Sequence, residues 1–168
     1  MKNPSPKNQG KIVGIQYAAL PYRIEAGQVW ILLITSRGTR RWVIPKGWPM
    51  NGLKPQDAAA TEAAEEAGIV GEVEDTPVGS YRYDKRLKGD ESTAVQVIVF
   101  PFRVQAQAED WKEQGQRVFE WFRYQKAAAL VAEPALRRLI VDFGFDRSPG
   151  FVARSLRTYR SWRANARG

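Results

Sequence analysis

Residues 42–69 read WVIPKGWPMNGLKPQDAAATEAAEEAGI, and the second half of this stretch predicts one short helix. Pro55 suits the first turn of that helix, where a missing N–H leaves no helical hydrogen bond unmade. Gly68 suits its end, where a left-handed residue is easiest without a Cβ. The alanines of the helix gather on one side, at a spacing that favours close packing on a sheet; they are Ala60, Ala63, Ala64 and Ala67.

The same helix carries Glu62, Glu65 and Glu66 on one narrow stripe. Like charges at this spacing repel by about 0.2–0.5 kcal/mol per pair on an isolated helix, and no Lys or Arg lies between Pro55 and Gly68 to relieve them. One interpretation is a solvated acidic face. The other is a bound divalent cation, which would turn the repulsion into coordination. Because the chain has no His and no Cys, the oxygen ligands indicate Mg²⁺ or Mn²⁺ rather than zinc.

The stretch resembles the Nudix box, whose pattern is Gly, five residues, Glu, seven residues, Arg-Glu, an apolar residue, any residue, Glu-Glu, any residue, Gly, apolar. Two positions depart from the pattern: Leu53 stands where the family has its first Glu, and Thr61 where it has an Arg that helps to hold the glutamates. The positions in register are Gly47, Glu62, Ala63, Glu65, Glu66, Gly68 and Ile69.

The resemblance implies a role for each carboxylate. Glu62 and Glu66 correspond to the metal ligands, and Glu65 to the candidate general base, with a further ligand as its alternative role. The loop before the box is expected to supply a backbone carbonyl to the metal near Lys46 and Gly47. Gly47 is equally consistent with a simple turn glycine.

The preceding run, TSRGTRRWVIPKG, resembles one branch of the family, the diphosphoinositol polyphosphate and diadenosine polyphosphate hydrolases. The triplets EDW (109–111) and EWF (120–122) occur at similar separation in that branch. The implied phosphate contacts come from this run and from a later charged turn, because Arg and Lys suit phosphate oxygens; they are Ser36, Arg37, Arg41, Arg82, Lys85 and Lys88. For Trp48 and Met50 we expect packing rather than base stacking. Trp111 and Trp121 are likewise expected to be structural.

Composition narrows the chemistry. The chain of 168 residues is 43% hydrophobic and 26% charged, which is ordinary for one globular domain. Because the chain has no His, Ser-His-Asp and Cys-His triads and histidine general bases are excluded. Any catalysis must therefore use carboxylates, Lys, Arg, Tyr, hydroxyls or a metal. The start, MKNPSPKNQG, lacks the apolar centre of a signal peptide. No apolar run is long enough to span a membrane, and the lack of Cys favours a cytoplasmic location.

The net charge of +8 is unevenly placed. Residues 147–168 hold six of the 26 basic residues and none of the 18 acidic ones. We therefore expect residues 1–10 to be a disordered leader, 11–146 the Nudix domain and 147–168 a basic tail, which could form an amphipathic helix. The tail makes nucleic acid a candidate partner, and the expected assembly is a monomer or homodimer.

Alternating and apolar runs predict strands on either side of the helix. Two helices follow, at 125–130 and 133–143, so the predicted fold is α+β, a mixed sheet sandwiched between helices, as in the Nudix family. Pro101 predicts a bulge or an edge position, and residues 21–28 a turn. The predicted strands are 11–20, 29–35, 42–45, 70–76 at an edge, 78–83, 94–104 and 118–124.

Three functions remain open from the sequence. The first is Mg²⁺-dependent hydrolysis of a phosphoanhydride in a small phosphorylated substrate, either a dinucleoside polyphosphate or a diphosphoinositol polyphosphate. The second is an RNA 5′-pyrophosphohydrolase whose Arg-rich tail binds the RNA backbone. The third is a Nudix-fold binding module that is catalytically silent because of Leu53 and Thr61.

Overall fold

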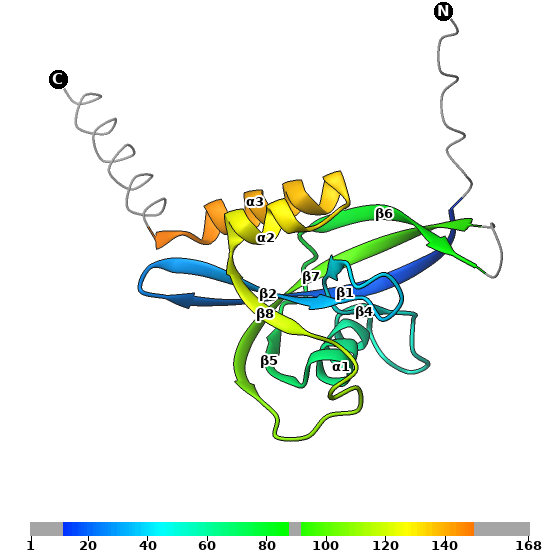
Figure 1. The fold of residues 1–168 in the computed structure, drawn as a ribbon, viewed down its shortest axis with the longest axis horizontal. Coiled ribbons are helices and arrows are strands. Elements are labelled where there is room, and N and C mark those ends of the chain that lie inside the picture. The colour runs from blue at the N-terminus through cyan, green and yellow to red at the C-terminus, as the bar shows by residue number, and fades with distance from the viewer. Residues whose placement is uncertain (1–11, 88–91, 150–168) are drawn as a thin grey trace, which may run out of the picture.

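The computed structural model describes residues 12–87 and 92–149, which are organised around one eight-stranded sheet (Figure 1). In chain order the elements are β1 (Ile12–Glu25), β2 (Gln28–Thr35), β3 (Trp42–Val43), β4 (Lys46–Gly47), α1 (Pro55–Ala67), β5 (Ile69–Val73), β6 (Gly79–Arg86), β7 (Ser92–Gln107), β8 (Phe119–Arg123), α2 (Tyr124–Leu130) and α3 (Pro134–Arg147). The leader and residues 150–168 of the tail lie outside the described residues. The other elements follow the predicted succession, except that strand β4 was not predicted and that α3 extends to Arg147, the first residue of the predicted tail.

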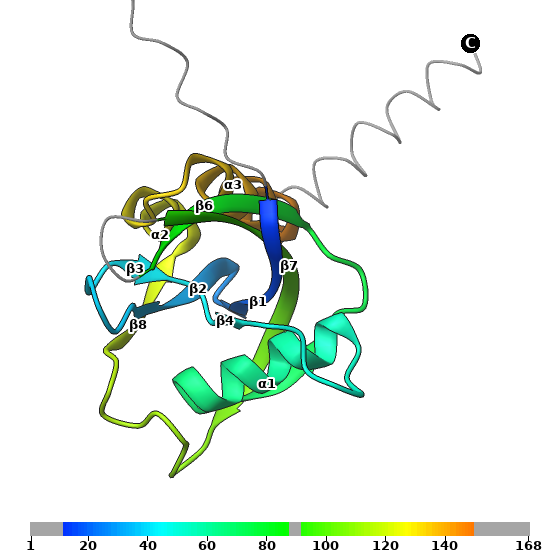
Figure 2. The same ribbon diagram turned by 90° about the vertical axis from the view of Figure 1, so that its right-hand side faces the viewer.

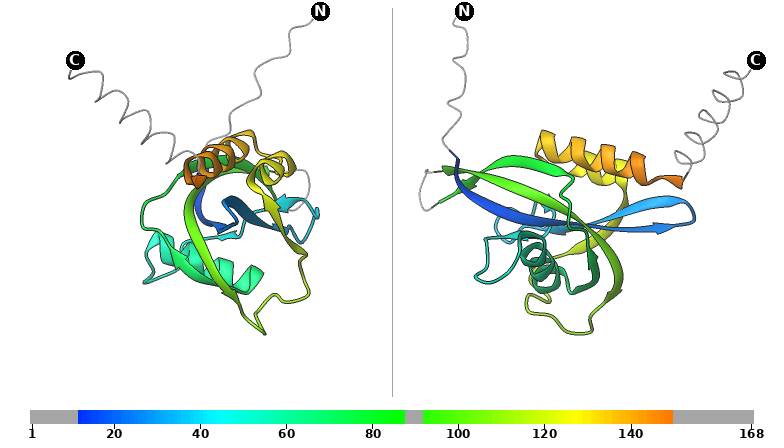
Figure 3. Two further views of the ribbon diagram at one scale, coloured as in Figure 1. Left: turned by 90° about the vertical axis from the view of Figure 1, so that its left-hand side faces the viewer. Right: turned by 180° about the vertical axis from the view of Figure 1, so that it is seen from behind.

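The sheet is mixed, and its two longest strands form the centre. β1 and β7 pair in parallel, whereas every other strand pair of the described residues is antiparallel. The main path is β3-β2-β1-β7-β5, with β4 on β1, β6 on β7 and β8 on β2. Helix α1 covers one face of the sheet, and α2 and α3 cover the other (Figures 2 and 3). The predicted α+β sandwich is confirmed.

Alternation along each strand builds the two cores, because neighbouring residues of a strand point to opposite faces. On β2, Ile31 and Leu33 join the core under α2 and α3, whereas Leu32 and Ile34 join the core under α1. All four are fully buried. A strand buried on both faces has no polar positions, which explains the near-continuous apolar run at 29–35.

Two prolines lie inside the central strands, and both were mispredicted. β1 does not end at residue 20 but continues through Pro21 to Glu25. Pro101 lies at neither an edge nor a bulge but in the middle of β7. Pro21 lies in the gap between the stretch of β1 that pairs with β4 and the stretch that pairs with β2. Pro101 likewise lies in the gap between the stretches of β7 that pair with β6 and with β5. A residue in such a gap has no ladder bond to donate there, so the missing N–H is tolerated.

The helices differ from prediction in two details. Helix α1 keeps its predicted limits, and Gly68 is left-handed at φ 64°. Its buried side differs, because Ala64 is exposed, whereas the buried alanines are Ala58, Ala59, Ala63 and Ala67. Helix α3 runs four residues further than predicted, through Gly144. A Cβ on Gly144 would lie 2.1 Å from Cγ of Tyr124, so the absent side chain lets α2 and α3 pack closely. None of these helices is long and apolar enough to cross a membrane.

Candidate active site

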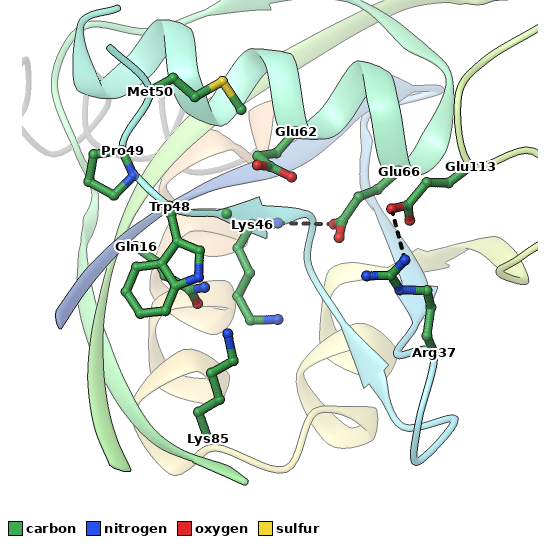
Figure 4. Close-up of a pocket in the computed structure, with 11 residues that line it drawn as sticks. Gln16, Arg37, Lys46, Trp48, Pro49, Met50, Glu62, Glu66, Lys85 and Glu113 are labelled. Carbon is green, nitrogen blue, oxygen red and sulfur yellow. Dashed lines mark hydrogen bonds and ion pairs between the residues drawn. The ribbon is translucent and has the colours of Figure 1, made fainter. Parts of the chain in front are cut away.

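A pocket of about 360 Å³ opens between α1 and the β4 end of the sheet (Figure 4). Segments far apart in the sequence meet there: β1, β4 and the loop after it, α1, β6, the β2–β3 loop and the β7–β8 loop. Six of the predicted site residues line it together. The full lining is Gln16, Arg37, Lys46, Gly47, Trp48, Pro49, Met50, Glu62, Glu66, Lys85 and Glu113.

Glu62 projects from α1 onto the backbone of β4, where Gly47 makes room for it. A Cβ on Gly47 would lie 1.7 Å from Oε1 of Glu62, closer than atoms can approach. Gly47 is paired with Tyr17 in the sheet, so it lies in a strand rather than in a turn, and the contact between its backbone carbonyl and a metal stays a prediction. Burial raises the pKa of the Glu62 carboxyl, and the charges of Glu65 and Glu113 raise it further.

Glu66, one turn along α1, has both carboxylate oxygens engaged. Oε1 accepts a hydrogen bond from Nη2 of Arg117 at 2.5 Å, and Oε2 accepts one from the backbone N–H of Lys46 at 3.1 Å. Burial raises the pKa of Glu66 to about 7, although Arg117 and Lys46 act in the opposite direction. The carboxylate is thus fixed in place at the edge of the pocket.

Glu65 lies beside these two residues but does not line the pocket. Its Oε2 is 2.7 Å from Nζ of Lys112, an exposed side chain of the β7–β8 loop. The base role that the resemblance gives to Glu65 remains a prediction.

The opposite wall of the pocket is basic. The side chains of Lys46 on β4 and Lys85 on β6 line the pocket there (Figure 4). Arg37 also lines the pocket, and its Nη1 lies 3.4 Å from Oε1 of Glu113. Burial lowers the pKa of the Lys46 ammonium, with the Glu66 charge opposing this shift. Sequence reasoning assigned only the backbone of residue 46 to the site. Its ammonium group is an additional candidate phosphate contact.

Trp48 does not cap the core as expected. Its side chain is 43% exposed and forms part of the pocket wall. The indole lies against Gly14, where a Cβ would be 2.6 Å from Cζ3, and Nζ of Lys85 is 4.7 Å from the ring centroid. The Trp48 ring is therefore held in place by these contacts and still accessible from the pocket.

The remaining predicted contacts point elsewhere or lie outside the described residues. The Ser36 hydroxyl pairs with Thr39 and accepts the backbone N–H of Arg41. The Arg41 guanidinium lies 3.6 Å from Glu133, at the start of α3. Arg82 on β6 does not line the pocket, and Lys88 falls outside the described residues. Trp111 is structural, as predicted, because it packs on Gly68 and edge-on to Phe119.

The sequence did not point to Gln16 and Glu113, which line the pocket, or to Arg117, which bonds Glu66 at its edge. Gln16 is buried, and its Oε1 accepts the hydroxyl of Tyr83 at 2.7 Å. Glu113 and Arg117 come from the β7–β8 loop, where their Nε to Oε2 distance is 2.7 Å. The only sequence signal was a charged loop near the EDW triplet, which does not reveal that the loop folds back onto α1.

The pocket fits a hard divalent cation. Within residues 12–87 and 92–149, no three acidic side chains gather as a ready metal-binding set. Glu62 and Glu66 instead share the pocket with the backbone of Gly47, which the Glu62 carboxylate approaches closely because residue 47 has no Cβ. Carboxylate and carbonyl oxygens are the donors that Mg²⁺ and Mn²⁺ prefer.

Known proteins are similar to this chain over most of its length. The family model of the NUDIX domain matches residues 17–143. Nudix hydrolase 18, mitochondrial, of Arabidopsis thaliana is 30% identical over 129 residues, 72% of this chain and 68% of the relative. Nudix hydrolase 12, mitochondrial, of the same plant is 26% identical over 116 residues, 67% and 57% of the two chains. The match thus spans between 57% and 68% of the length of these relatives.

Solved structures share the fold. The Ap4A hydrolase of C. elegans superposes with a TM-score of 0.56 at 20% identity, covering 79% of this chain and 96% of the other. A NUDIX hydrolase from Nitrosomonas europaea gives a TM-score of 0.58 at 22% identity, covering 80% and 90%. At these identities the likeness is one of fold.

Proposed function

The chain belongs to the Nudix family of hydrolases, and we propose that it cleaves a phosphoanhydride bond in a dinucleoside polyphosphate with the help of Mg²⁺. One observation carries this proposal: the pocket sets Glu62 and Glu66 opposite the cationic side chains of Lys46 and Lys85. Such a pocket has one end for a metal and one for phosphate. A bound Mg²⁺ supplies charge neutralisation at the phosphate oxygens during attack by water.

The chain's own residues divide the work. Glu62 and Glu66 would hold the metal, with the β4 backbone at Gly47 beside them. Lys46, Lys85 and Arg37 bind phosphate oxygens. Arg37 must then leave Glu113, 3.4 Å away. The Arg37 side chain is 62% exposed, and Glu113 keeps its ion pair with Arg117, so this separation costs little.

Glu65 is the candidate base for the attacking water, on the strength of the family pattern. It takes this role only when its contact with Lys112 opens. Lys112 is an exposed side chain, so breaking this contact costs little free energy.

The lining favours a dinucleoside polyphosphate over a diphosphoinositol polyphosphate. The pocket is lined by three cations and three carboxylates, and β1 contributes the neutral Gln16. This lining carries little net positive charge for binding an inositol ring crowded with phosphates. Trp48 offers an accessible aromatic face on which a nucleobase can stack. The fold shared with the Ap4A hydrolase of C. elegans supports the same substrate class.

A substrate panel tests the proposal. Product release would be measured for diadenosine polyphosphates, nucleoside triphosphates, ADP-ribose, diphosphoinositol polyphosphates and 5′-triphosphorylated RNA, each with Mg²⁺, Mn²⁺ or chelator. We expect metal-dependent cleavage with the highest kcat/KM on a diadenosine polyphosphate. Trp48→Leu should raise KM for that substrate and leave KM for a diphosphoinositol polyphosphate, which has no nucleobase, unchanged.

Other outcomes identify the alternatives. Preference for RNA, with a steep loss at high salt, would favour the RNA hydrolase. Tight binding without turnover of any substrate would favour the silent binding module.

A further inference from the structure

We infer that Arg117 is the positioning residue of the metal-binding carboxylate Glu66, supplied from the β7–β8 loop rather than from the helix itself. The inference rests on the proposed function and deepens it. No cation lies between Pro55 and Gly68 on the chain, and the structure brings one to the helix from 51 residues away.

The guanidinium of Arg117 is committed on three sides. Nη2 donates to Oε1 of Glu66 at 2.5 Å, Nε to Oε2 of Glu113 at 2.7 Å, and Nη1 to the carbonyl oxygen of Thr35 at 3.1 Å. The side chain is 8% exposed. The planar fork therefore has one orientation, because turning toward any new partner breaks at least two of these bonds.

The backbone around Arg117 is anchored as well. The N–H of Val118 donates to Oγ1 of Thr35 at 3.0 Å, and the N–H of Thr35 donates to the carbonyl oxygen of Val118 at 2.8 Å. This reciprocal pair fastens the end of the loop to the end of β2. Arg117 thus holds a carboxylate on α1 at a fixed place relative to the sheet.

Glu66 is held from both sides and still able to bind a metal. Oε1 faces Arg117, and Oε2 accepts the N–H of Lys46 at 3.1 Å. An ionised carboxylate offers about four acceptor positions, so these two hydrogen bonds leave others for a cation. Fixing a ligand by groups behind it is how proteins orient metal sites.

The side chains of Thr61 and Lys112, which are nearer to Glu66 in sequence, do not hold it. The Thr61 hydroxyl donates to the backbone carbonyl of Asp57 at 2.9 Å, one turn back along the helix. Lys112 pairs with Glu65 and is 67% exposed. Arg117 is also saturated by protein groups, so it is not placed to bind substrate directly. Its loss is therefore expected to change kcat rather than KM.

The test compares Arg117→Met with Arg137→Met in the full chain. Arg137 is the matched control, because its guanidinium bonds two backbone carbonyls, of Ala128 and Val131, on the face of the sheet away from the pocket. We expect Arg117→Met to lower kcat by about 10- to 100-fold with KM within about twofold of wild type. Arg137→Met should lower Tm while kcat stays unchanged.

A second readout does not depend on activity. The Lys46 amide reports the position of Glu66, because it donates to that carboxylate. In ¹⁵N-resolved hydrogen exchange without metal, we expect this amide to exchange at least about tenfold faster in Arg117→Met, and at its wild-type rate in Arg137→Met. Should Arg117→Met fail to fold, Arg117→Lys, which keeps the charge without the fork, should show a smaller change of the same sign.

Each alternative has its own result. A rise in KM with kcat preserved would make Arg117 a substrate contact, and a fall in Tm with kcat and the Lys46 amide unchanged would make it merely structural; either overturns the inference. If the wild type hydrolyses nothing, the proposed function fails, and the Lys46 amide alone decides whether Arg117 positions Glu66.

Discussion

At the scale of single residues, the site depends on the close contact between Gly47 and Glu62. The carboxylate of Glu62 lies where a Cβ on residue 47 would be. The backbone of Gly47 has an ordinary φ, since the positive-φ glycines of the described chain are others. The glycine is therefore required by its neighbour and not by the backbone.

Gly47→Ala is predicted to disable the site while leaving the fold intact. The new methyl group must displace the Glu62 carboxylate, and a misplacement of about 1 Å can cost about 100-fold in rate. Steady-state kinetics should show that loss, with Tm within a few degrees of wild type. Gly38→Ala is the control, because a Cβ there meets nothing within 4 Å. Equal rates for the two variants would mean that Glu62 does not need its observed position.

The carboxylate stripe could be predicted from sequence, but its partners could not. Helical spacing alone places Glu62 and Glu66 on one side of α1. Arg117 binds Glu66 across 51 residues of chain, and no local periodicity reports such a pairing. Close approach at Gly47 is invisible for the same reason, because it depends on which side chain folds onto it.

At the scale of elements, one ion pair ties α3 to the segment after β5. Arg147 donates to Oε2 of Glu74 at 2.6 Å and to the hydroxyl of Tyr22 at 2.9 Å, and that hydroxyl donates to Oε1 of Glu74 at 3.0 Å. Burial disfavours the ionised form of Glu74, but the bonds from Arg147 and Tyr22 outweigh it and lower the pKa of the carboxyl.

The lowered pKa predicts acid-labile stability. A carboxyl whose folded pKa is depressed stabilises the fold above its unfolded pKa, and the contribution disappears as pH falls through the folded value. Urea unfolding should therefore show wild type more stable than Glu74→Gln at pH 7, with the difference shrinking below about pH 4. A difference that is constant from pH 7 to pH 3 would show that the Glu74 charge is not responsible.

Element limits were predictable where local chemistry sets them. Helix α1 begins at Pro55 and ends before Gly68 as expected, because both residues act through their own backbone. The errors fall at residues that usually interrupt elements, namely Pro21, Pro101 and Gly144. The reason in each case lies in segments distant in sequence. The prolines lie in gaps between antiparallel strand partners, and Gly144 lies where the Tyr124 ring leaves no room for a Cβ.

At the scale of the whole molecule, the fold gathers acidic groups that resist ionisation. The pKa values of Glu62 and Glu66 are both raised, first of all by burial. A carboxyl whose pKa is raised on folding destabilises the fold above its usual pKa. The metal-free protein at neutral pH therefore holds an unfavourable charge that a divalent cation can relieve.

Mg²⁺ is accordingly predicted to stabilise the protein. A ligand at 100 times its Kd adds about 2.7 kcal/mol to the free energy of unfolding, which would raise Tm by several degrees. Glu62→Gln should unfold at a higher temperature than wild type in chelator, because it lacks the buried charge, and should lose the shift with Mg²⁺. Thermal unfolding monitored by circular dichroism measures both. A Mg²⁺ shift that survives in Glu62→Gln would place the metal elsewhere.

The most direct measurement compares wild type with Glu66→Gln on a diadenosine polyphosphate, in Mg²⁺ and in chelator, with calorimetry to confirm that both proteins bind the substrate. The account predicts that wild type turns over only with Mg²⁺ and that Glu66→Gln is at least about 100-fold slower while still binding. Turnover in chelator, or equal rates for the two proteins, would contradict metal-dependent hydrolysis at this pocket.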